Sequence, residues 1–226
     1  MNQKTWRGTI ITILFTVILL CANPARAQSA ILSTNSDSTV AWAAKSSLTN
    51  IWENGVGEGF RSAAQSITVT TGAGYGLEDF GSKQSHDLAL VSVAYGYMLG
   101  TLWRDHWFRG NGELRGEFFT GEQFSPSSDW LMGVAPHLRY NFATGTRWVP
   151  YLDAGAGVSA TSIGPPDLSH YFEFNLQATA GIRCFIRNNL ALCAETRYLH
   201  MSCAGINKPN EGLNTMMGMV GVSWFF

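Results

Sequence analysis

From about residue 64 onward, the sequence alternates between two kinds of side chain, and this period of two is what most limits how the chain can fold. Residues 108–118 show it most clearly, because every second position is polar or charged: Arg109, Asn111, Glu113, Arg115 and Glu117. The residues between them are Phe, Gly or Leu. A strand collects such charges on one face, whereas a helix would scatter them around its circumference. The segment is therefore predicted to be a β-strand with one charged face.

Seven further segments show the same alternation, separated by stretches rich in Gly, Ser, Asn, Pro and Asp. The eight predicted strands cover about 64–77, 87–99, 108–118, 130–142, 148–160, 171–186, 190–202 and 214–226. The connections after the second, fourth and sixth strands are short, and the others, at about 78–86, 121–129, 161–170 and 203–213, are longer. This layout is typical of outer-membrane barrels. The expected fold is all-β, an eight-stranded antiparallel transmembrane β-barrel.

The polar faces of these strands carry five basic and five acidic residues. They are Arg109, Arg115, Arg139, Arg183 and Arg197 beside Glu113, Glu117, Asp153, Glu173 and Glu195. Each charge would cost ~2–4 kcal/mol if it faced lipid near the middle of a membrane. The interior of an eight-stranded barrel is narrow enough for side chains to fill it and to pair. The sequence therefore predicts a filled, charged lumen, which opposes both an open channel and a soluble calyx with an apolar interior.

The first 27 residues have the pattern of a secretory signal peptide. Lys4 and Arg7 precede an apolar run from Ile10 to Cys21, and Ala25-Arg26-Ala27 supplies a cleavage site. The apolar run is too short to span a bilayer as a helix. The chain is therefore expected in the bacterial outer membrane, with residues 1–27 as the signal, 28–63 as a periplasmic N-terminal segment and 64–226 as the barrel.

Two further expectations concern partners. Without residues 1–27 the chain has 12 basic and 16 acidic residues, a balance that does not favour nucleic acid. An aromatic residue at the end of an alternating strand resembles the signal read by barrel-assembly machinery. Phe226 is accordingly expected to contact that machinery, and the apolar wall is expected to contact outer-membrane lipids.

Three polar residues are predicted to share the outer face of the barrel near one rim. The alternation of 190–202 places His200 and Ser202 outside, and counting back from Phe226 places Asn214 there too. Residues i and i+2 of a strand lie ~6.5–7 Å apart at Cα, within reach of a His–Ser hydrogen bond. Polar groups on a bilayer-facing surface are costly without a purpose. The grouping suits acyl transfer, with a base, a nucleophile and a third group that orients the base.

Backbone amides near Gly205 could supply an oxyanion hole for such chemistry. The other histidines are dispersed along the chain and lack the spacing of metal ligands: His86, His106, His137 and His170. No metal or other cofactor is therefore expected. His and Ser near a rim could equally bind headgroups or face water, so the spacing by itself leaves a non-catalytic role open.

These residues also lie within a longer motif. His200-Met201-Ser202-Cys203-Ala204-Gly205 is followed by Pro209-Asn210-Glu211-Gly212-Leu213-Asn214 and an aromatic-ended strand. The segment resembles the lipid A 3-O-deacylases, outer-membrane acyl-ester hydrolases with the pattern His-x-Ser-Asn-x-Gly, a Pro-Asn-x-Gly loop and then an acidic or amide residue. The resemblance implies an eight-stranded barrel with its active site facing the outer leaflet, His200 as base, Ser202 as nucleophile and Gly205 as a backbone oxyanion donor.

Two positions depart from the family pattern. Cys203 stands where the family usually has Asn, which puts a side-chain oxyanion donor in doubt. Asn214 stands where Glu is found, and an amide can hold an imidazole but cannot stabilise its charged form; Glu211 is an alternative acid. The expected function is hydrolysis of an ester-linked acyl chain of lipid A in the lipopolysaccharide of the outer leaflet. The alternative, favoured by Cys203 and Asn214, is a non-catalytic barrel that binds surface partners through its outer loops.

Overall fold

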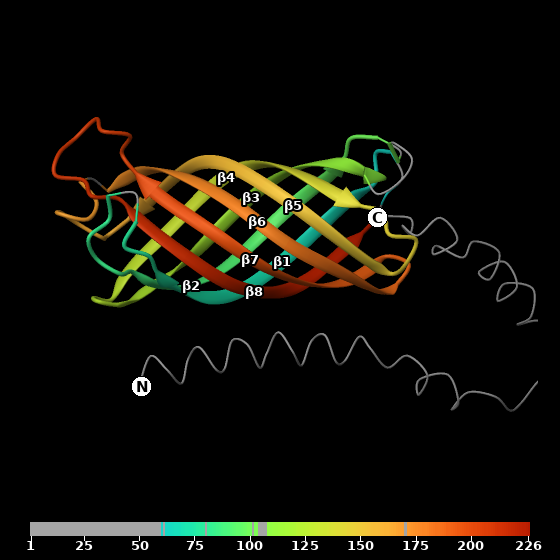
Figure 1. Cartoon of the computed structure of the whole chain (residues 1–226), viewed down its shortest axis with the longest axis horizontal. Helices are drawn as coiled ribbons and strands as arrows, with labels where there is room; N and C mark the ends of the chain where they lie inside the picture. The colour runs from blue at the N-terminus through green and yellow to red at the C-terminus, as the bar shows by residue number, and fades with distance from the viewer. Residues whose placement is uncertain (1–59, 61, 80, 101, 104–107, 170) are drawn as a thin grey trace, which may run out of the picture.

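The computed structural model describes residues 60, 62–79, 81–100, 102–103, 108–169 and 171–226. They form a closed barrel in which every strand pairs antiparallel with its neighbours in sequence, and β8 closes onto β1 (Figure 1). Among these residues, no helix is long and apolar enough to cross a membrane. The strands are β1 (Gln65–Gly76), β2 (Asp87–Met98), β3 (Gly110–Ser125), β4 (Asp129–Phe142), β5 (Trp148–Thr161), β6 (Phe172–Arg187), β7 (Leu190–Ser202) and β8 (Leu213–Phe225).

The predicted barrel of eight antiparallel strands is confirmed. The largest difference concerns β3, which continues to Ser125 because the alternation persists: Gln123 is still buried and still pairs with Asp129 of β4. The following connection is thereby reduced to 126–128, instead of the predicted 121–129. Arg109, predicted to be a lumen charge, precedes β3 and is partly exposed.

The two ends of the barrel differ, and we name them by their connections. The loop end carries the connections 77–86, 126–128, 162–171 and 203–212, and the turn end carries 99–109, 143–147 and 188–189. At the turn end Phe60 packs on Phe185 with ring centroids 6.0 Å apart. The predicted signal segment and most of the predicted segment 28–63 lie outside the described residues, so this division of the chain stays a prediction.

The middle of the lumen holds a network of buried ion pairs, as the sequence predicts. Its direct contacts join Arg183 to Glu113 at 2.8 Å, Arg115 and Arg139 to Asp153 at 2.6 and 2.8 Å, and Arg197 to Glu117 and Glu195 at 2.9 and 2.7 Å. His137 contributes its Nδ1, 2.6 Å from Asp153 Oδ1. Pairing of this kind offsets the cost of removing each charge from water.

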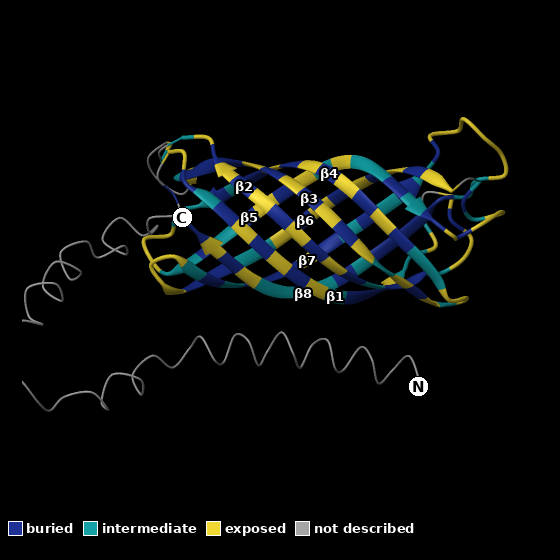
Figure 2. Cartoon of the chain, turned by 180° about the vertical axis from the view of Figure 1, so that it is seen from behind, coloured by how far each residue is buried: buried dark blue, intermediate teal, exposed yellow. Residues whose placement is uncertain are grey.

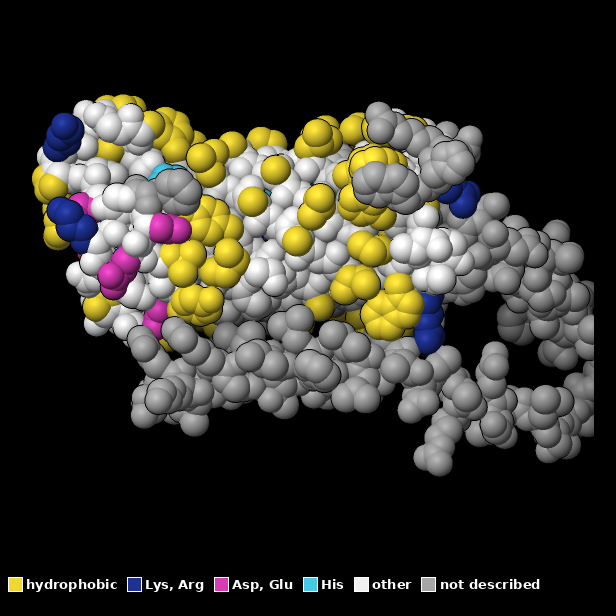
Figure 3. Space-filling model, in the orientation of Figure 1, with side chains coloured by type: hydrophobic (Ala, Val, Ile, Leu, Met, Phe, Trp, Pro, Cys, Tyr) yellow, Lys and Arg dark blue, Asp and Glu magenta, His cyan; other side chains and the backbone are white. Residues whose placement is uncertain are grey.

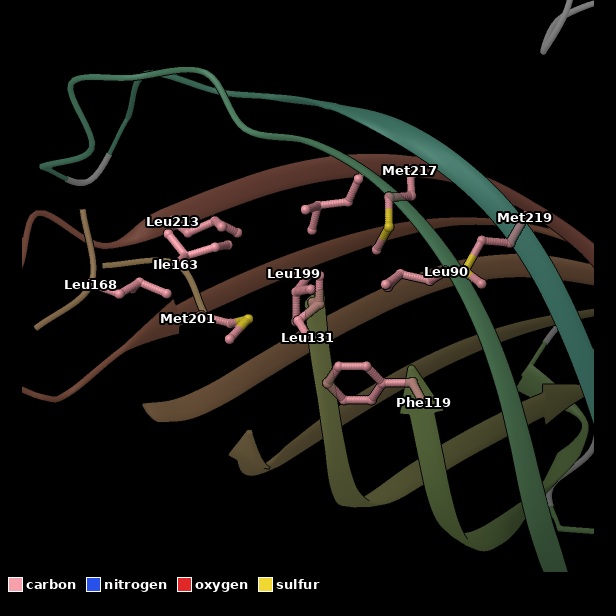
Figure 4. Close-up of a cluster of buried hydrophobic side chains, with 11 residues drawn as sticks. Leu90, Phe119, Leu131, Ile163, Leu168, Leu199, Met201, Leu213, Met217 and Met219 are labelled. Carbon is pink, nitrogen blue, oxygen red and sulfur yellow. The ribbon is translucent and has the colours of Figure 1, made fainter. Parts of the chain in front are cut away.

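Apolar layers close the lumen on both sides of this network, which the prediction of a charged interior did not include. At the loop end, inward-facing Leu and Met side chains of β7 and β8 pack against Phe119, Leu131 and the loop residues Ile163 and Leu168 (Figure 4). At the turn end, Phe60, Phe185 and Phe225 belong to a second cluster. The charged network therefore lies between two apolar plugs.

Along the strands, residues that face the outside of the barrel alternate with residues that face the lumen. Figure 2 shows buried residues alternating with exposed or intermediate ones along the strands in view, and Figure 3 shows hydrophobic side chains over the wall with charged ones toward the two ends. Large apolar residues such as Val91, Leu138, Leu152 and Leu176 are about half exposed, between 46% and 60%. An apolar exterior around a charged interior is the arrangement that a bilayer requires.

Candidate active site

His200, Ser202 and Asn214 meet at the loop end of the barrel. His200 and Ser202 end β7, and the register of β7 with β8 sets His200 directly opposite Asn214. Their neighbours along the two strands, Leu199, Met201 and Leu213, belong to the apolar plug of the loop end. Because side chains alternate along a strand, His200, Ser202 and Asn214 lie on the outer wall.

A continuous hydrogen-bonded chain joins the three side chains. His200 Nδ1 is 2.6 Å from Asn214 Oδ1, and His200 Nε2 is 3.1 Å from Ser202 Oγ. Asn214 Nδ2 is 2.6 Å from the carbonyl oxygen of Asp79, which can only accept, so the amide nitrogen must face that carbonyl. Asn214 Oδ1 then faces the imidazole and takes a hydrogen bond from Nδ1–H. This tautomer leaves the Nε2 lone pair to accept from the Ser202 hydroxyl.

Two residues that the sequence did not single out hold Asn214 in place. The hydroxyl of Tyr198 donates to Asn214 Oδ1 over 2.8 Å, and the backbone N–H of Leu77 donates to the Asn214 carbonyl over 2.8 Å. Asn214 is 0% exposed, although it belongs to the outer face. Tyr198 could have been found from the alternation, because it lies two residues before His200; the Asp79 loop offers no such signal.

Gly212 borders the imidazole. Its φ is +79°, a conformation that glycine adopts without strain. A Cβ at this position would lie 3.4 Å from His200 Cε1 and 3.9 Å from Ser202 Cβ. These are ordinary van der Waals distances, so it is the positive φ rather than a lack of space that favours glycine beside the His–Ser pair.

The residues 203–206 form a tight turn directly after Ser202. Ala204 and Gly205 have φ of +55° and +79°, and the N–H of Ile206 donates to the Cys203 carbonyl over 3.1 Å. The Cys203 side chain is buried, and its Sγ donates to the Asn207 carbonyl over 3.3 Å. Hydrogen bonding from Ser169 and from the backbone of the turn lowers the pKa of the Cys203 thiol. Gly205 is exposed, with open space around its Cα.

Glu211, the alternative acid, binds elsewhere. Its carboxylate forms an ion pair with Lys83 at 2.5 Å, and its N–H donates to the carbonyls of Pro166 and Asp167. Asn210, next to it, donates to both carboxylate oxygens of Glu173 over 3.2 Å. These contacts tie the 203–212 loop to the loops beside it.

An apolar strip on β6 runs beside the polar chain. Register pairing places Phe174 opposite Ser202 and Leu176 opposite His200. Phe172, Phe174 and Leu176 are 57%, 44% and 54% exposed on the outer wall. The nucleophile candidate therefore has a hydrophobic surface on one side and polar loops above it.

Among the described residues, no group of three or more His, Cys, Asp and Glu side chains is arranged to hold a metal ion. The other buried histidines of the described part have their own partners: His86 Nδ1 lies 2.7 Å from Gln123 Oε1, and His137 belongs to the lumen network.

The closed barrel, its apolar wall and the hydrogen-bonded Ser, His and Asn on that wall define an outer-membrane β-barrel with a hydrolase-like surface site. More specifically, the chain belongs to the family described as "Lipid A 3-O-deacylase (PagL)", whose family model matches residues 89–223.

Comparisons with individual proteins agree with this assignment. The chain is 28% identical over 150 residues to lipid A deacylase PagL of Pseudomonas aeruginosa, covering 59% of this chain and 84% of that protein. It is 32% identical over 133 residues to lipid A deacylase PagL of Bordetella bronchiseptica, covering 54% and 70%. The crystal structure of Neisserial surface protein A matches with a TM-score of 0.52 at 18% identity, covering 73% of this chain and 98% of that one. This last likeness concerns the barrel fold alone.

Proposed function

We propose that this outer-membrane protein hydrolyses an ester-linked acyl chain of lipid A, with Ser202 as nucleophile and His200 as base. The observation that carries the proposal is the hydrogen-bonded chain from Asn214 through His200 to Ser202. The activity stated in the names of the two PagL relatives supports the substrate. An intact chain of this kind argues against the non-catalytic alternative, because nothing in surface binding requires it.

The geometry suggests the order of the steps. Ser202 Oγ attacks the ester carbonyl while its proton passes to His200 Nε2, and a tetrahedral intermediate forms. Collapse of the intermediate expels the sugar oxygen, which takes the proton from His200 and leaves an acyl-serine. Water, deprotonated by His200, then attacks the acyl-serine, releases the fatty acid and restores Ser202. The N–H of Gly205 is the proposed donor to the oxyanion, and the buried Cys203 is the weaker candidate.

The proposed site faces lipid, so the substrate reaches it from within the leaflet. The ester-linked chain would lie along Phe172, Phe174 and Leu176, whose exposed area suits an acyl tail. The sugar headgroup would then meet the polar loops at the loop end. Recognition of Phe226 by barrel-assembly machinery and removal of residues 1–27 stay predictions.

The test is to express the chain in an outer membrane that lacks such an activity and to weigh the lipid A by mass spectrometry. We expect lipid A to lose the mass of one ester-linked acyl chain. Faster gel mobility of the unboiled protein would confirm that the barrel has folded. Unchanged lipid A beside a folded barrel would contradict the proposal and favour the non-catalytic alternative.

Asn214 gives a second, smaller expected effect. Asn214→Leu removes the acceptor that sets the imidazole tautomer, so we expect turnover to fall by about 10- to 100-fold. Asn214→Asp keeps an acceptor for the imidazole but loses the N–H that binds the Asp79 carbonyl, so it should retain clearly more activity than Asn214→Leu. The measurement is the rate of fatty-acid release from lipid A by purified barrels in detergent micelles. Equal rates for the Leu and Asp variants would show that Asn214 does not orient His200.

A further inference from the structure

We propose that Asp79, in the connection after β1, is a positioning residue that orients Asn214 and supplies the site with the negative charge that Asn214 lacks. The inference rests on the proposed function, because it assigns Asp79 a part in the same reaction. Figure 1 shows the connection after β1 and the loop before β8 at the same end of the barrel.

The backbone of Asp79 determines how the Asn214 amide is turned. The Asp79 carbonyl accepts from Asn214 Nδ2 over 2.6 Å, between residues 135 positions apart in the chain. The same carbonyl accepts from the N–H of Ser82 over 2.9 Å, and this second hydrogen bond helps to hold it in place. The N–H of Leu77 binds the Asn214 carbonyl, which fastens this connection to β8 at a second point. The imidazole tautomer at His200 therefore depends on the conformation of the Asp79 loop.

Asp79, whose backbone carbonyl binds Asn214, is itself half-buried. Its Oδ1 is shielded from solvent and has no hydrogen-bond partner among the described residues. The Asp79 backbone and the Tyr198 hydroxyl bind the same Asn214 amide, the carbonyl of Asp79 at Nδ2 and the hydroxyl at Oδ1. A carboxylate oxygen that is shielded from water without a partner is unfavourable in the resting protein. A positive charge formed in the same site, as when His200 takes the proton of Ser202, would reduce that cost.

The surroundings of the imidazole leave Asp79 as the acid placed for this role. On the β6 side the neighbour is the apolar Leu176, on the β8 side it is the uncharged Asn214, and from the 203–212 loop it is Gly212. Glu211 is paired with Lys83. On β7, Tyr198 is the titratable group that shares the outer face with His200, whereas Glu195 and Arg197 face the lumen; the Tyr198 hydroxyl binds Asn214 Oδ1.

The test compares Asp79→Asn with the wild-type protein in rate-against-pH profiles of lipid A deacylation. The substitution keeps the backbone carbonyl and removes the charge. We expect turnover to fall about tenfold, because charge interactions in partly buried surroundings are of this size. We also expect the acid limb of the profile to move to lower pH, because the lost charge favours protonated His200. Asp129→Asn, which removes a carboxylate at the start of β4, should change neither quantity.

A rescue variant separates charge from structure. In an Asp79→Asn, Asn214→Glu double variant a carboxylate again faces the imidazole, so turnover and the acid limb should return toward wild-type values. Asp79→Ser replaces Asp79→Asn if that variant does not give a heat-modifiable barrel. An unchanged profile, or a loss of turnover without movement of the acid limb, would overturn the inference. If Ser202→Ala is as active as wild type, the proposed function fails instead, whatever Asp79 does.

Discussion

Ser202→Ala is expected to lower lipid A deacylation by about 10³-fold or more, because it removes the atom proposed to attack the ester. In a triad with a charged third member the loss reaches about 10⁶-fold. A smaller loss is expected here because Asn214 carries no charge, so the wild-type rate is itself lower. The remaining rate would come from substrate binding and the oxyanion donors alone. The measurement is single-turnover release of fatty acid from lipid A by barrels in detergent micelles.

Three further variants make this result specific. His200→Asn should cost about as much as Ser202→Ala, and the double variant should cost little more, because the two residues act as a unit. Ser128→Ala changes a serine of the 126–128 connection, whose hydroxyl binds Glu122, and should leave the rate unchanged. Additive losses of activity in the His200 and Ser202 variants would contradict a step that both residues share. Full activity of Ser202→Ala would exclude Ser202 as the nucleophile.

Arg183→Met is expected to lower the free energy of unfolding of the barrel by about 3–5 kcal/mol, because it leaves a buried charge without its partner. Arg183 Nη1 and Nη2 lie 2.8 and 3.2 Å from the two carboxylate oxygens of Glu113, and both side chains are 0% exposed. Arg183 Nη1 also donates to Asn141 Oδ1 over 3.0 Å. The pair is buried between the two apolar plugs, where an unpaired charge is costly.

Two further variants show whether the stability loss of Arg183→Met comes from the unpaired charge or from the altered shape of the side chain. Glu113→Gln in the Arg183→Met chain removes the unpaired charge and should recover a large part of the loss. Lys208→Met, at an exposed position of the 203–212 loop, should have little effect. Urea unfolding in detergent micelles, followed by tryptophan fluorescence, measures all four proteins. Unfolding of Arg183→Met at the wild-type urea concentration would show that the lumen network does not stabilise the barrel.

The strands could be predicted because their pattern is local. Every second residue of a strand faces the same side, so charged runs such as Glu113, Arg115 and Glu117 mark the lumen without knowledge of any partner. The end of β3 was placed too early, because turn-forming residues follow Phe118 while pairing with β4 continues to Gln123. Which charges pair could not be predicted, since Arg183 and Glu113 belong to strands that are not adjacent.

The residues of the candidate site can be separated in the same way, into those predictable from a local pattern and those that depend on how distant segments meet. His200 and Ser202 are two residues apart on one strand, and Asn214 follows on the next strand after a single loop, so counting alone brought them to one face. Glu211 could not be assigned from its position, because its ion pair with Lys83 depends on how two loops meet. Cys203 could not be assigned either, because its thiol turns into the backbone of the turn at Asn207.

By itself, then, the sequence determined the barrel, its charged interior, its apolar wall and the face that carries His200, Ser202 and Asn214. Each of these follows from the period of two in single strands or in neighbouring ones. Only the tertiary structure decided that Asp79 binds Asn214 and that apolar layers lie on both sides of the charged network. Closure of β8 onto β1 brings Asp79 and Asn214 together across most of the barrel sequence, and contacts made by closure leave no periodic signal in the chain.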